Sequence, residues 1–224
     1  MIKYIFFDFD GTISDARRLT HEKFLETLEE CEFKFSKQKL KSLMGAKTKE
    51  ILIGLGIDAK AHSKVRRLFL KKAIGDSNSK TLKLCADVKP LYKIKKDGIK
   101  IIILSNSHKS FLTKSIKVLK IKGLFNKVYG SRPLRSKDQI LRKLFRKYNI
   151  KPKEAIYVGD RFSDIEYAHK AHCHAVGIHN KCSWSTKKEI LKEKPDFMIK
   201  DFKELKKLVE KLNSNQAATR PSQH

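Results

Sequence analysis

The sequence has 224 residues, 40% of them hydrophobic, and its 51 Lys and Arg against 24 Asp and Glu give a formal net charge of +27. This length and composition exclude a disordered chain and a long repeat array, and they fit one elaborated domain or a core with a smaller second domain. Because the apolar runs are too short to cross a bilayer and the first residues lack a signal-peptide pattern, we expect a cytoplasmic protein without membrane partners.

The first part of the chain contains a short strand followed by a long helical segment. Residues 3–9 form an apolar and aromatic run that stops at Gly11, which predicts a buried strand ending in a turn. From residue 16 the apolar residues recur at helical spacing, and breaks in this pattern leave about four short helices. We therefore predict a small α-helical domain at residues 16–79, inserted after the first strand.

Strands and helices alternate through the rest of the chain. Apolar runs such as residues 99–104 and 155–158 predict strands, and the segments between such runs have the periodicity of helices. This alternation implies an α/β fold, in which a parallel sheet has helices on both faces. The predicted core contains residues 1–15 and 80–212, and the polar residues 213–224 are predicted to form a disordered tail.

Two carboxylates stand at the end of the first predicted strand, in the segment Asp8-Phe9-Asp10-Gly11-Thr12. Alternation along a strand directs Asp8 and Asp10 to the same side, where their like charges require a cation, a shared proton or nearby basic groups. Magnesium suits such oxygen ligands and also bridges phosphate. An alternative for this segment alone is an aspartate that caps a helix beside a turn glycine.

Two later strand ends have residues suited to binding an anion or a metal. Ser105 and Asn106 offer a hydroxyl and backbone N–H groups to an anion, and Asp160 and Asp164 surround a turn into a helix. Lys137 opens a predicted helix between them. Each of these residues alone has a simpler explanation as a helix cap or a solvated lysine. Because the carboxyl ends of parallel strands meet in one crevice, we predict that they form one site.

In this order, the segments F-D-F-D-G-T, L-S-N, a lone Lys and G-D-x-x-x-D resemble the four motifs of the haloacid dehalogenase superfamily. The resemblance covers residues 1–212, and the helical insert after the first motif is similar to that of the phosphoglycolate phosphatase and β-phosphoglucomutase-like members. It implies a Rossmann-like core with an α-helical cap. Two positions depart from the pattern: Asp138 follows the lysine where these members usually have Pro, and His172 stands where Gly is common.

The resemblance implies a role for three residues of the first motif. Asp8 would be the nucleophile that becomes phosphorylated, and also a magnesium ligand. Asp10 would protonate the leaving oxygen and then deprotonate the attacking water, while its backbone carbonyl binds the metal. Thr12 would help to hold the phosphate-binding turn.

The resemblance also implies how the later motifs complete the site. Ser105 and Asn106 would hold the transferring phosphoryl group, and Lys137 would neutralise charge on this group and on the nucleophile. Asp160 would be a further magnesium ligand. Asp164 would bind the metal directly or through water.

The helical cap contains a loop that is similar to the substrate-contacting loop of related caps, Gly45-Ala46-Lys47-Thr48-Lys49. Lys47 and Lys49 are therefore candidates to bind an anionic leaving group. The alternative is that both are solvated lysines at the start of a helix. A cap that closes over the phosphate site would exclude water and select the substrate.

The predicted function is the magnesium-dependent hydrolysis of a small phosphorylated metabolite through an aspartyl-phosphate. An acid at position 10 favours phosphoryl transfer, since the true dehalogenases of the superfamily lack it. A phosphoglucomutase-type transferase shares every core motif and stays open. A protein that binds nucleic acid or dephosphorylates its ends also stays open because of the positive charge. We favour a small ester, since the lysines are spread along the chain and no nucleic-acid-binding module is visible; the oligomeric state is left open.

Overall fold

A six-stranded sheet forms the centre of the computed structural model, which describes residues 1–131 and 135–218. The strand order is β5-β4-β1-β6-β7-β8, and every pair of neighbouring strands is parallel. This architecture confirms the predicted α/β fold. The strands are β1 (Tyr4–Phe7), β4 (Lys100–Leu104), β5 (Lys127–Tyr129), β6 (Ala155–Gly159), β7 (His174–Ile178) and β8 (Phe197–Ile199).

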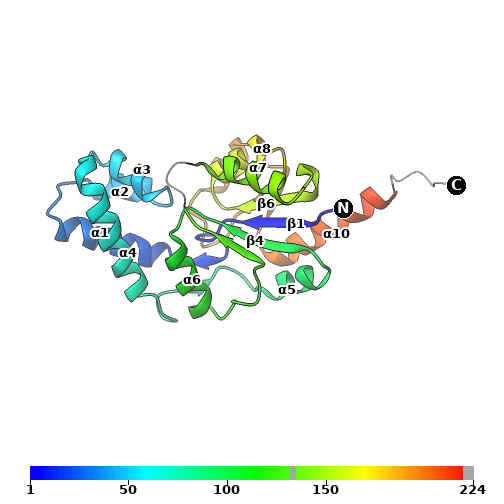
Figure 1. Cartoon of the computed structure of the whole chain (residues 1–224), viewed down its shortest axis with the longest axis horizontal. Coiled ribbons are helices and arrows are strands. Elements are labelled where there is room, and N and C mark those ends of the chain that lie inside the picture. Colours follow the sequence, from blue (N-terminus) through cyan, green and yellow to red (C-terminus); the bar gives the residue numbers. More distant parts are fainter. Residues whose placement is uncertain (132–134, 219–224) are drawn as a thin grey trace.

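Helices cover both faces of this sheet (Figure 1). Along β1, Ile5 and Phe7 pack with α5, α6 and α10, whereas Phe6 packs on the opposite face with α7, α8 and α9. Among the described helices, none is long and apolar enough to span a membrane. The covering helices are α5 (Lys89–Lys96), α6 (Lys109–Val118), α7 (Lys137–Lys147), α8 (Phe162–Lys170), α9 (Lys187–Lys192) and α10 (Phe202–Ala218).

Four further helices lie together beyond the carboxyl ends of the strands (Figure 1). We call them the helical segment; they are α1 (Arg17–Glu30), α2 (Lys37–Leu43), α3 (Thr48–Gly54) and α4 (His62–Gly75). Their buried side chains, including Phe24, Leu40, Leu52 and Val65, form a core separate from those of the sheet. Four helices occur where the helical periodicity predicted about four.

An antiparallel pair of short strands joins the helical segment to the sheet. The chain enters the segment after β2 (Ser14–Asp15) and leaves it before β3 (Lys83–Leu84), and these two strands pair with each other. The sequence did not indicate this pair, because two-residue strands are too short to show alternation. The pairing holds the two connections of the helical segment side by side.

The last helix is longer than the sequence predicted. We expected it to end at residue 212 and a disordered tail to begin there, but α10 continues to Ala218. Polar contacts support the added turn: the backbone N–H of Ile2 donates to the Asn213 side chain (2.6 Å), and the Ser214 hydroxyl donates to the Glu210 carbonyl (2.6 Å). The predicted tail is therefore wrong for residues 213–218, and residues 219–224 lie outside the described residues.

The backbone at His172 shows why glycine is common at this position in similar sequences. This residue follows α8 with a φ of 58°, in the left-handed region. Its N–H donates to the His169 carbonyl and the N–H of Cys173 donates to the Ala168 carbonyl, which together form a Schellman motif. Glycine is favoured at this position of the motif because it has no Cβ to strain the left-handed conformation.

We therefore predict that His172→Gly stabilises the protein. Relief of left-handed strain, reduced by the greater entropy of glycine in the unfolded chain, is expected to raise the free energy of unfolding by about 0.5–1 kcal/mol. Urea denaturation measures the change. His172→Ala is the matched control, since it removes the same side chain and retains the strain. A glycine variant no more stable than the alanine variant would contradict this account.

Candidate active site

Three strand ends meet at one edge of the sheet. Phe7 of β1 pairs with Ile103 of β4 on one side and with Val158 of β6 on the other, so the segments that follow these strands start at the same level. This edge is also where the strand order changes direction, the usual ligand site of such sheets. The predicted site residues that follow the three strands are Asp8, Asp10 and Thr12, then Ser105 and Asn106, and then Asp160 and Asp164.

Lys137, the first residue of α7, lies between two of these carboxylates. Its Nζ is 2.6 Å from Oδ1 of Asp164 and 3.1 Å from Oδ1 of Asp8, and the residue is only 3% exposed. The ring of Tyr157 lies 5.5 Å from this amine, and the tyrosine hydroxyl donates to the Leu104 carbonyl. The structure thus brings the lysine singled out from the sequence into contact with the predicted nucleophile.

Burial and neighbouring charges act in opposite directions on these groups. Burial alone would lower the pKa of Lys137, but the negative charges of Asp164 and Asp8 outweigh it and raise that pKa. Burial raises the pKa of Asp8 although the charge of Lys137 opposes the shift. The lysine therefore stays protonated, and its single charge compensates only part of the acid cluster.

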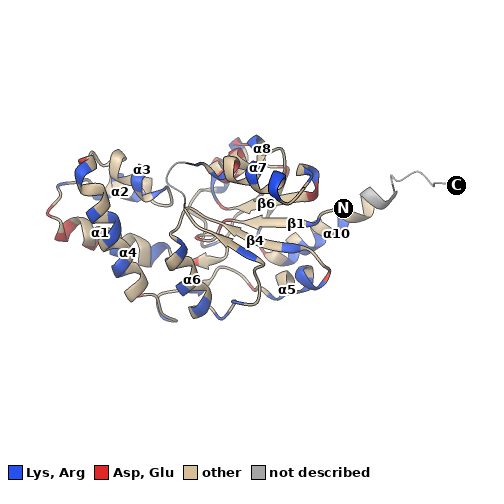
Figure 2. Cartoon of the chain, in the orientation of Figure 1, with Lys and Arg blue, Asp and Glu red and all other residues tan. Residues whose placement is uncertain are grey.

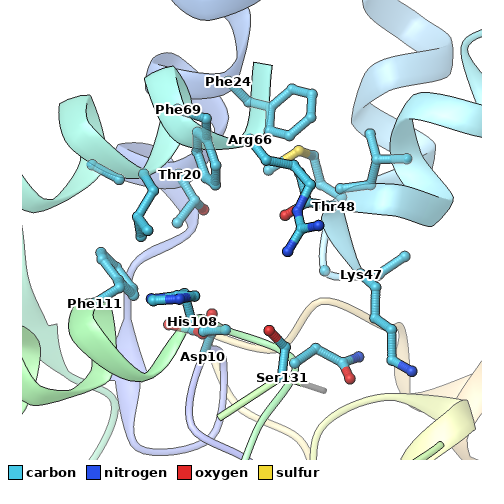
Figure 3. Close-up of a pocket in the computed structure, with 18 of the residues that line it drawn as sticks. Asp10, Thr20, Phe24, Lys47, Thr48, Arg66, Phe69, His108, Phe111 and Ser131 are labelled. Atoms are coloured by element: carbon cyan, nitrogen blue, oxygen red, sulfur yellow. The ribbon is translucent and has the colours of Figure 1, made fainter. Parts of the chain in front are cut away.

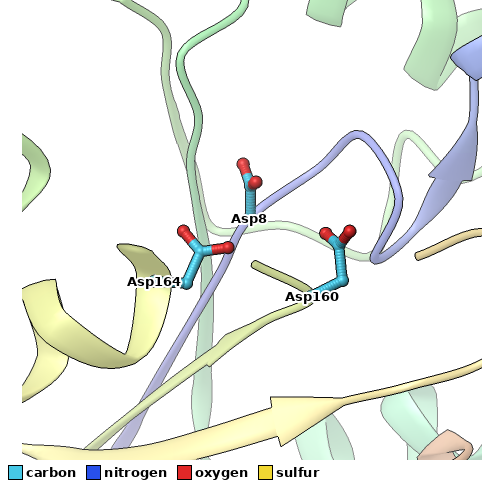
Figure 4. Close-up of side chains that lie close together, drawn as sticks. All are labelled: Asp8, Asp160 and Asp164. Carbon is cyan, nitrogen blue, oxygen red and sulfur yellow. The ribbon is translucent and has the colours of Figure 1, made fainter. Parts of the chain in front are cut away.

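Asp160 completes a group of three buried carboxylates (Figure 4). One ligand oxygen each from Asp8, Asp160 and Asp164 can lie within 4.8 Å of the others. The Thr12 hydroxyl (2.9 Å) and the Trp184 backbone N–H (2.6 Å) donate to Asp160, while burial and the charges of the other two acids raise its pKa. Three carboxylates beside one lysine are suited to a hard cation bound through oxygen, which would offset their negative charge.

The turn after β1 packs directly against Asp160. Gly11 has a φ of 87°, and a Cβ at this position would lie 2.4 Å from Oδ2 of Asp160 and 2.6 Å from the Trp184 ring. Only glycine fits this conformation and this space without a shift of its neighbours. The glycine therefore allows the turn to hold Thr12 against Asp160.

Asp10 is partly buried and faces a cavity (Figure 3). The Ser107 hydroxyl donates to its Oδ2 (2.5 Å), whereas Oδ1 is buried without a hydrogen-bond partner among the described residues. Desolvation raises the pKa of Asp10 to about 7, against the opposing effect of the Ser107 hydrogen bond. A carboxyl group with this pKa can both donate and accept a proton near neutral pH. Its side chain lies outside the group of three carboxylates, so its predicted metal role concerns the backbone carbonyl alone.

The cavity has a volume of about 370 Å³ and lies between the strand ends and the helical segment (Figure 3). Asp8 and Asp10 line it together with the loop that follows β4. Lys47 and Lys49, from the start of α3, line it as well, and Nζ of Lys47 donates to the Arg135 carbonyl (2.7 Å). The structure therefore places both predicted cap lysines in the same space as the acids.

The loop after β4 contributes polar groups to this cavity. Ser105 and Asn106 both line it, as the sequence predicted. The Ser105 hydroxyl is 3.1 Å from the backbone nitrogen of Ser107, which donates to it. This hydrogen bond shapes the turn and directs Ser107 toward Asp10, a contact that sequence reasoning missed.

Other lining residues were also missed. Arg161 donates from Nη1 to the Met44 carbonyl (3.2 Å), which connects the turn after β6 to the helical segment. Arg66 projects from α4 into the cavity (Figure 3). Arg161 lies inside the G-D-x-x-x-D segment, so the sequence could have marked it as a candidate site residue. Helical periodicity identifies the polar face of α4 that carries Arg66, but it cannot show that this face lines a cavity.

Comparison with known proteins shows the family. The model described as Haloacid dehalogenase-like hydrolase matches residues 5–178. The chain belongs to this family. It is 27% identical over 220 residues to "Putative pyrophosphatase PpaX" of Caldanaerobacter subterraneus, with 93% of this chain and 94% of the relative covered. It is also 27% identical over 229 residues to a phosphoglycolate phosphatase of Mannheimia succiniciproducens, with 92% and 98% covered.

Solved structures of other proteins share the fold. A haloacid dehalogenase-like hydrolase from Streptococcus pneumoniae has a TM-score of 0.79 at 20% identity, with 93% of this chain and 98% of that chain covered. CbbY from Rhodobacter sphaeroides, solved in complex with phosphate, has a TM-score of 0.78 at 16% identity, with 92% and 96% covered. The comparisons therefore confirm the family and the α/β fold that the four motifs indicated.

We predict that Lys137→Met destabilises the protein strongly in metal-free buffer. Loss of the amine leaves Asp8 and Asp164 buried beside each other without compensation, and breaking a buried ion pair in this way costs about 3–5 kcal/mol. Urea denaturation in the presence of EDTA measures the loss. Lys143→Met, an exposed change on the same helix, is the control and should stay within about 0.5 kcal/mol. Equal stability of the two variants would contradict the conclusion that Lys137 stabilises the fold by compensating the charges of Asp8 and Asp164.

Proposed function

We propose that this chain is a phosphatase that hydrolyses a small phosphate monoester through an aspartyl-phosphate on Asp8. The observation that carries the proposal is the contact of Asp8 with Lys137 at the edge of a cavity that also contains Asp10. The Phe9 N–H (2.8 Å) and the lysine amine both contact Oδ1 of Asp8, so Oδ2 is available to attack phosphorus. Relatives named as phosphoglycolate phosphatases support the same type of reaction.

The reaction has two steps with one acid and base. First, Oδ2 of Asp8 forms a bond to phosphorus while the bond to the leaving oxygen breaks, and Asp10 gives that oxygen a proton. Second, Asp10 takes a proton from water, whose oxygen attacks phosphorus and releases Asp8 and inorganic phosphate. A pKa of about 7 suits Asp10 to both transfers, and the Ser107 hydroxyl orients it.

The transferring phosphoryl group needs donors for its oxygens. Ser105 and Asn106 line the cavity next to Asp8 and supply a hydroxyl and a backbone N–H. Lys137 offsets charge on the phosphoryl group and on Asp8, and Thr12 fixes the turn through its bond to Asp160. Donors that are already in place stabilise charge that develops during transfer without reorganisation.

We assign magnesium to the three carboxylates Asp8, Asp160 and Asp164, with the backbone carbonyl of Asp10 as a further ligand. The donor set fits, because all groups are oxygens and the one lysine leaves the acid cluster with excess negative charge. Lys137 contacts Oδ1 of Asp164, so Oδ2 of that residue is available to a cation. On Asp8 the cation would share Oδ1 with Lys137, which leaves Oδ2 for the attack on phosphorus. Bound magnesium would offset negative charge on the phosphoryl group during transfer.

We further propose that residues 16–79 act as a cap over a core of residues 1–15 and 80–212. Arg161 and Lys47 each donate to a backbone carbonyl across the boundary between the two parts. Ala73 of α4 also packs with Phe111 of α6 in a shared apolar cluster. A cap held in this position encloses the leaving group and limits the access of water.

A small-molecule phosphatase, a mutase and a nucleic-acid phosphatase differ in their substrate and in the molecule that accepts the phosphoryl group. A mutase would exclude water and pass the phosphoryl group to a second sugar phosphate, so inorganic phosphate would not accumulate. The positive charge gives little support to nucleic acid, because Lys and Arg occur on helices of both the helical segment and the sheet part (Figure 2). A panel of small phosphate esters and 5′- and 3′-phosphorylated oligonucleotides, assayed for released phosphate, tests the proposal. We expect turnover of a small ester, and release from oligonucleotides alone would overturn it.

We predict that Asp8→Asn abolishes phosphate release, because an amide is a poor nucleophile. Asp10→Asn should lower kcat by about 10²–10⁴, since the group must give and then take a proton. Steady-state assays on the best ester of the panel measure both effects. Asp97→Asn, an exposed change that also removes one carboxylate, should leave kcat unchanged. Substantial turnover by Asp8→Asn would remove this residue from the nucleophile's role.

We predict that magnesium stabilises the protein as well as activating it. At a concentration of about 100 times Kd, binding to the folded state alone adds about 2.7 kcal/mol to the free energy of unfolding. Thermal unfolding with magnesium, and with EDTA at equal ionic strength, measures the shift independently of activity. Asp160→Asn should abolish most of it, whereas Asp58→Asn on the helical segment should not. An identical shift in the Asp160 variant would place the metal elsewhere.

A further inference from the structure

Arg66 is an exposed cation that lines the cavity. Its side chain extends from α4 past Phe24 and Phe69 into the space above Ser131 and Asp10 (Figure 3). Among the residues that the structure describes, none forms a hydrogen bond or an ion pair with its guanidinium. By contrast, Lys72 on the same helix faces α1 and is 2.6 Å from the carboxylate of Glu30.

The cavity as a whole has more positive than negative groups. Five Lys and Arg side chains line it against two carboxylates, and one of these two, Asp8, already contacts Lys137. Two of the five cations donate to backbone carbonyls of the protein, as described above. The cations are Lys47, Lys49, Arg66, Arg67 and Arg161. A substrate with only one anionic group, the phosphoryl itself, would leave this excess charge unused.

An apolar wall stands beside Arg66. Phe24 and Phe69 pack with their ring centroids 4.9 Å apart, and both line the cavity with Phe111 and Ile51. A volume of about 370 Å³ is within the range of pockets that enclose organic ligands of ring size or larger. Each methylene that a ligand buries against such a wall raises affinity about fourfold.

We propose that the substrate is a phosphate monoester whose leaving group has a ring-sized carbon framework and a second anionic group, which Arg66 binds. The guanidinium fork matches the paired oxygens of a carboxylate or a phosphate, and the apolar wall contacts the carbon framework. Esters with only two carbons, such as phosphoglycolate, fill little of the cavity and leave the wall uncovered. The inference rests on the proposed phosphatase function and assigns the part of the substrate that is not transferred.

Four esters test the inference as a matched series: phenyl phosphate, 4-carboxyphenyl phosphate, 1,4-phenylene bisphosphate and 2-phosphoglycolate. The comparison is the ratio of kcat/KM between wild type and Arg66→Met for each ester, because this ratio cancels differences in leaving-group reactivity. We expect Arg66→Met to lose about 10- to 100-fold on one of the two doubly anionic aryl esters and less than about twofold on phenyl phosphate. The ester that shows the larger loss identifies a carboxylate or a phosphate as the second anion.

Two further variants separate recognition from charge and folding. Arg66→Lys keeps the charge without the fork and should fall between wild type and Arg66→Met on the same ester. Lys64→Met removes one exposed cation from the same helix, outside the cavity, and controls for long-range attraction of anions. Its ratios should stay near one for all four esters.

Each remaining outcome has a defined meaning. No turnover of any ester by wild type would refute the proposed phosphatase function itself. Turnover with equal losses on phenyl phosphate and on the doubly anionic esters would place Arg66 at the transferred phosphoryl group and overturn the inference. Turnover with no loss on any ester would overturn it as well. Wild-type kcat/KM higher for 2-phosphoglycolate than for every aryl ester would refute the ring-sized framework.

Discussion

The contact of one buried amine with two buried carboxylates determines how the rest of the site can be built. Lys137 joins α7 to Asp8 after β1 and to Asp164 on α8, so three elements distant in sequence are fixed at one point. In a low-dielectric interior, ionised carboxylates are costly unless each is paired, and a third acid, Asp160, has no cation beside it among the described residues. The shortage of positive charge explains why the site suits a divalent cation and an anionic substrate together.

The same burial links the helical segment to the chemistry. Burial raises the pKa of Asp10 to about 7, and this carboxyl group faces a cavity that the helical segment and the loop after β4 also line. In the proposed mechanism, burial of Asp10 therefore suits it to act as the acid and base beside the space for the leaving group.

Much of the sheet and the acid cluster could be predicted from sequence because the signals are local and strong. Asp8, Ser105 and Asp160 each follow directly after an apolar strand. Because these strands are parallel neighbours, the three residues meet at one edge of the sheet. The sequence could not reveal Arg66, since helical periodicity identifies the buried face of α4 but not what lies opposite its polar face. The end of α10 was also missed, because residues 213–218 are mostly polar and show no apolar periodicity, and the contact of Asn213 with the distant Ile2 is visible only in the fold.

The central claim is that the phosphoryl group passes through Asp8. The most direct measurement is rapid quenching of the enzyme during turnover of its best ester, followed by borohydride reduction and peptide mass spectrometry. Reduction converts an aspartyl-phosphate to homoserine, so the account predicts homoserine at position 8 in wild type, dependent on substrate, and unmodified Asp10 and Asp160 in the same digest. Modification at a different carboxylate, or inorganic phosphate released in rapid turnover with position 8 always unmodified, would contradict it.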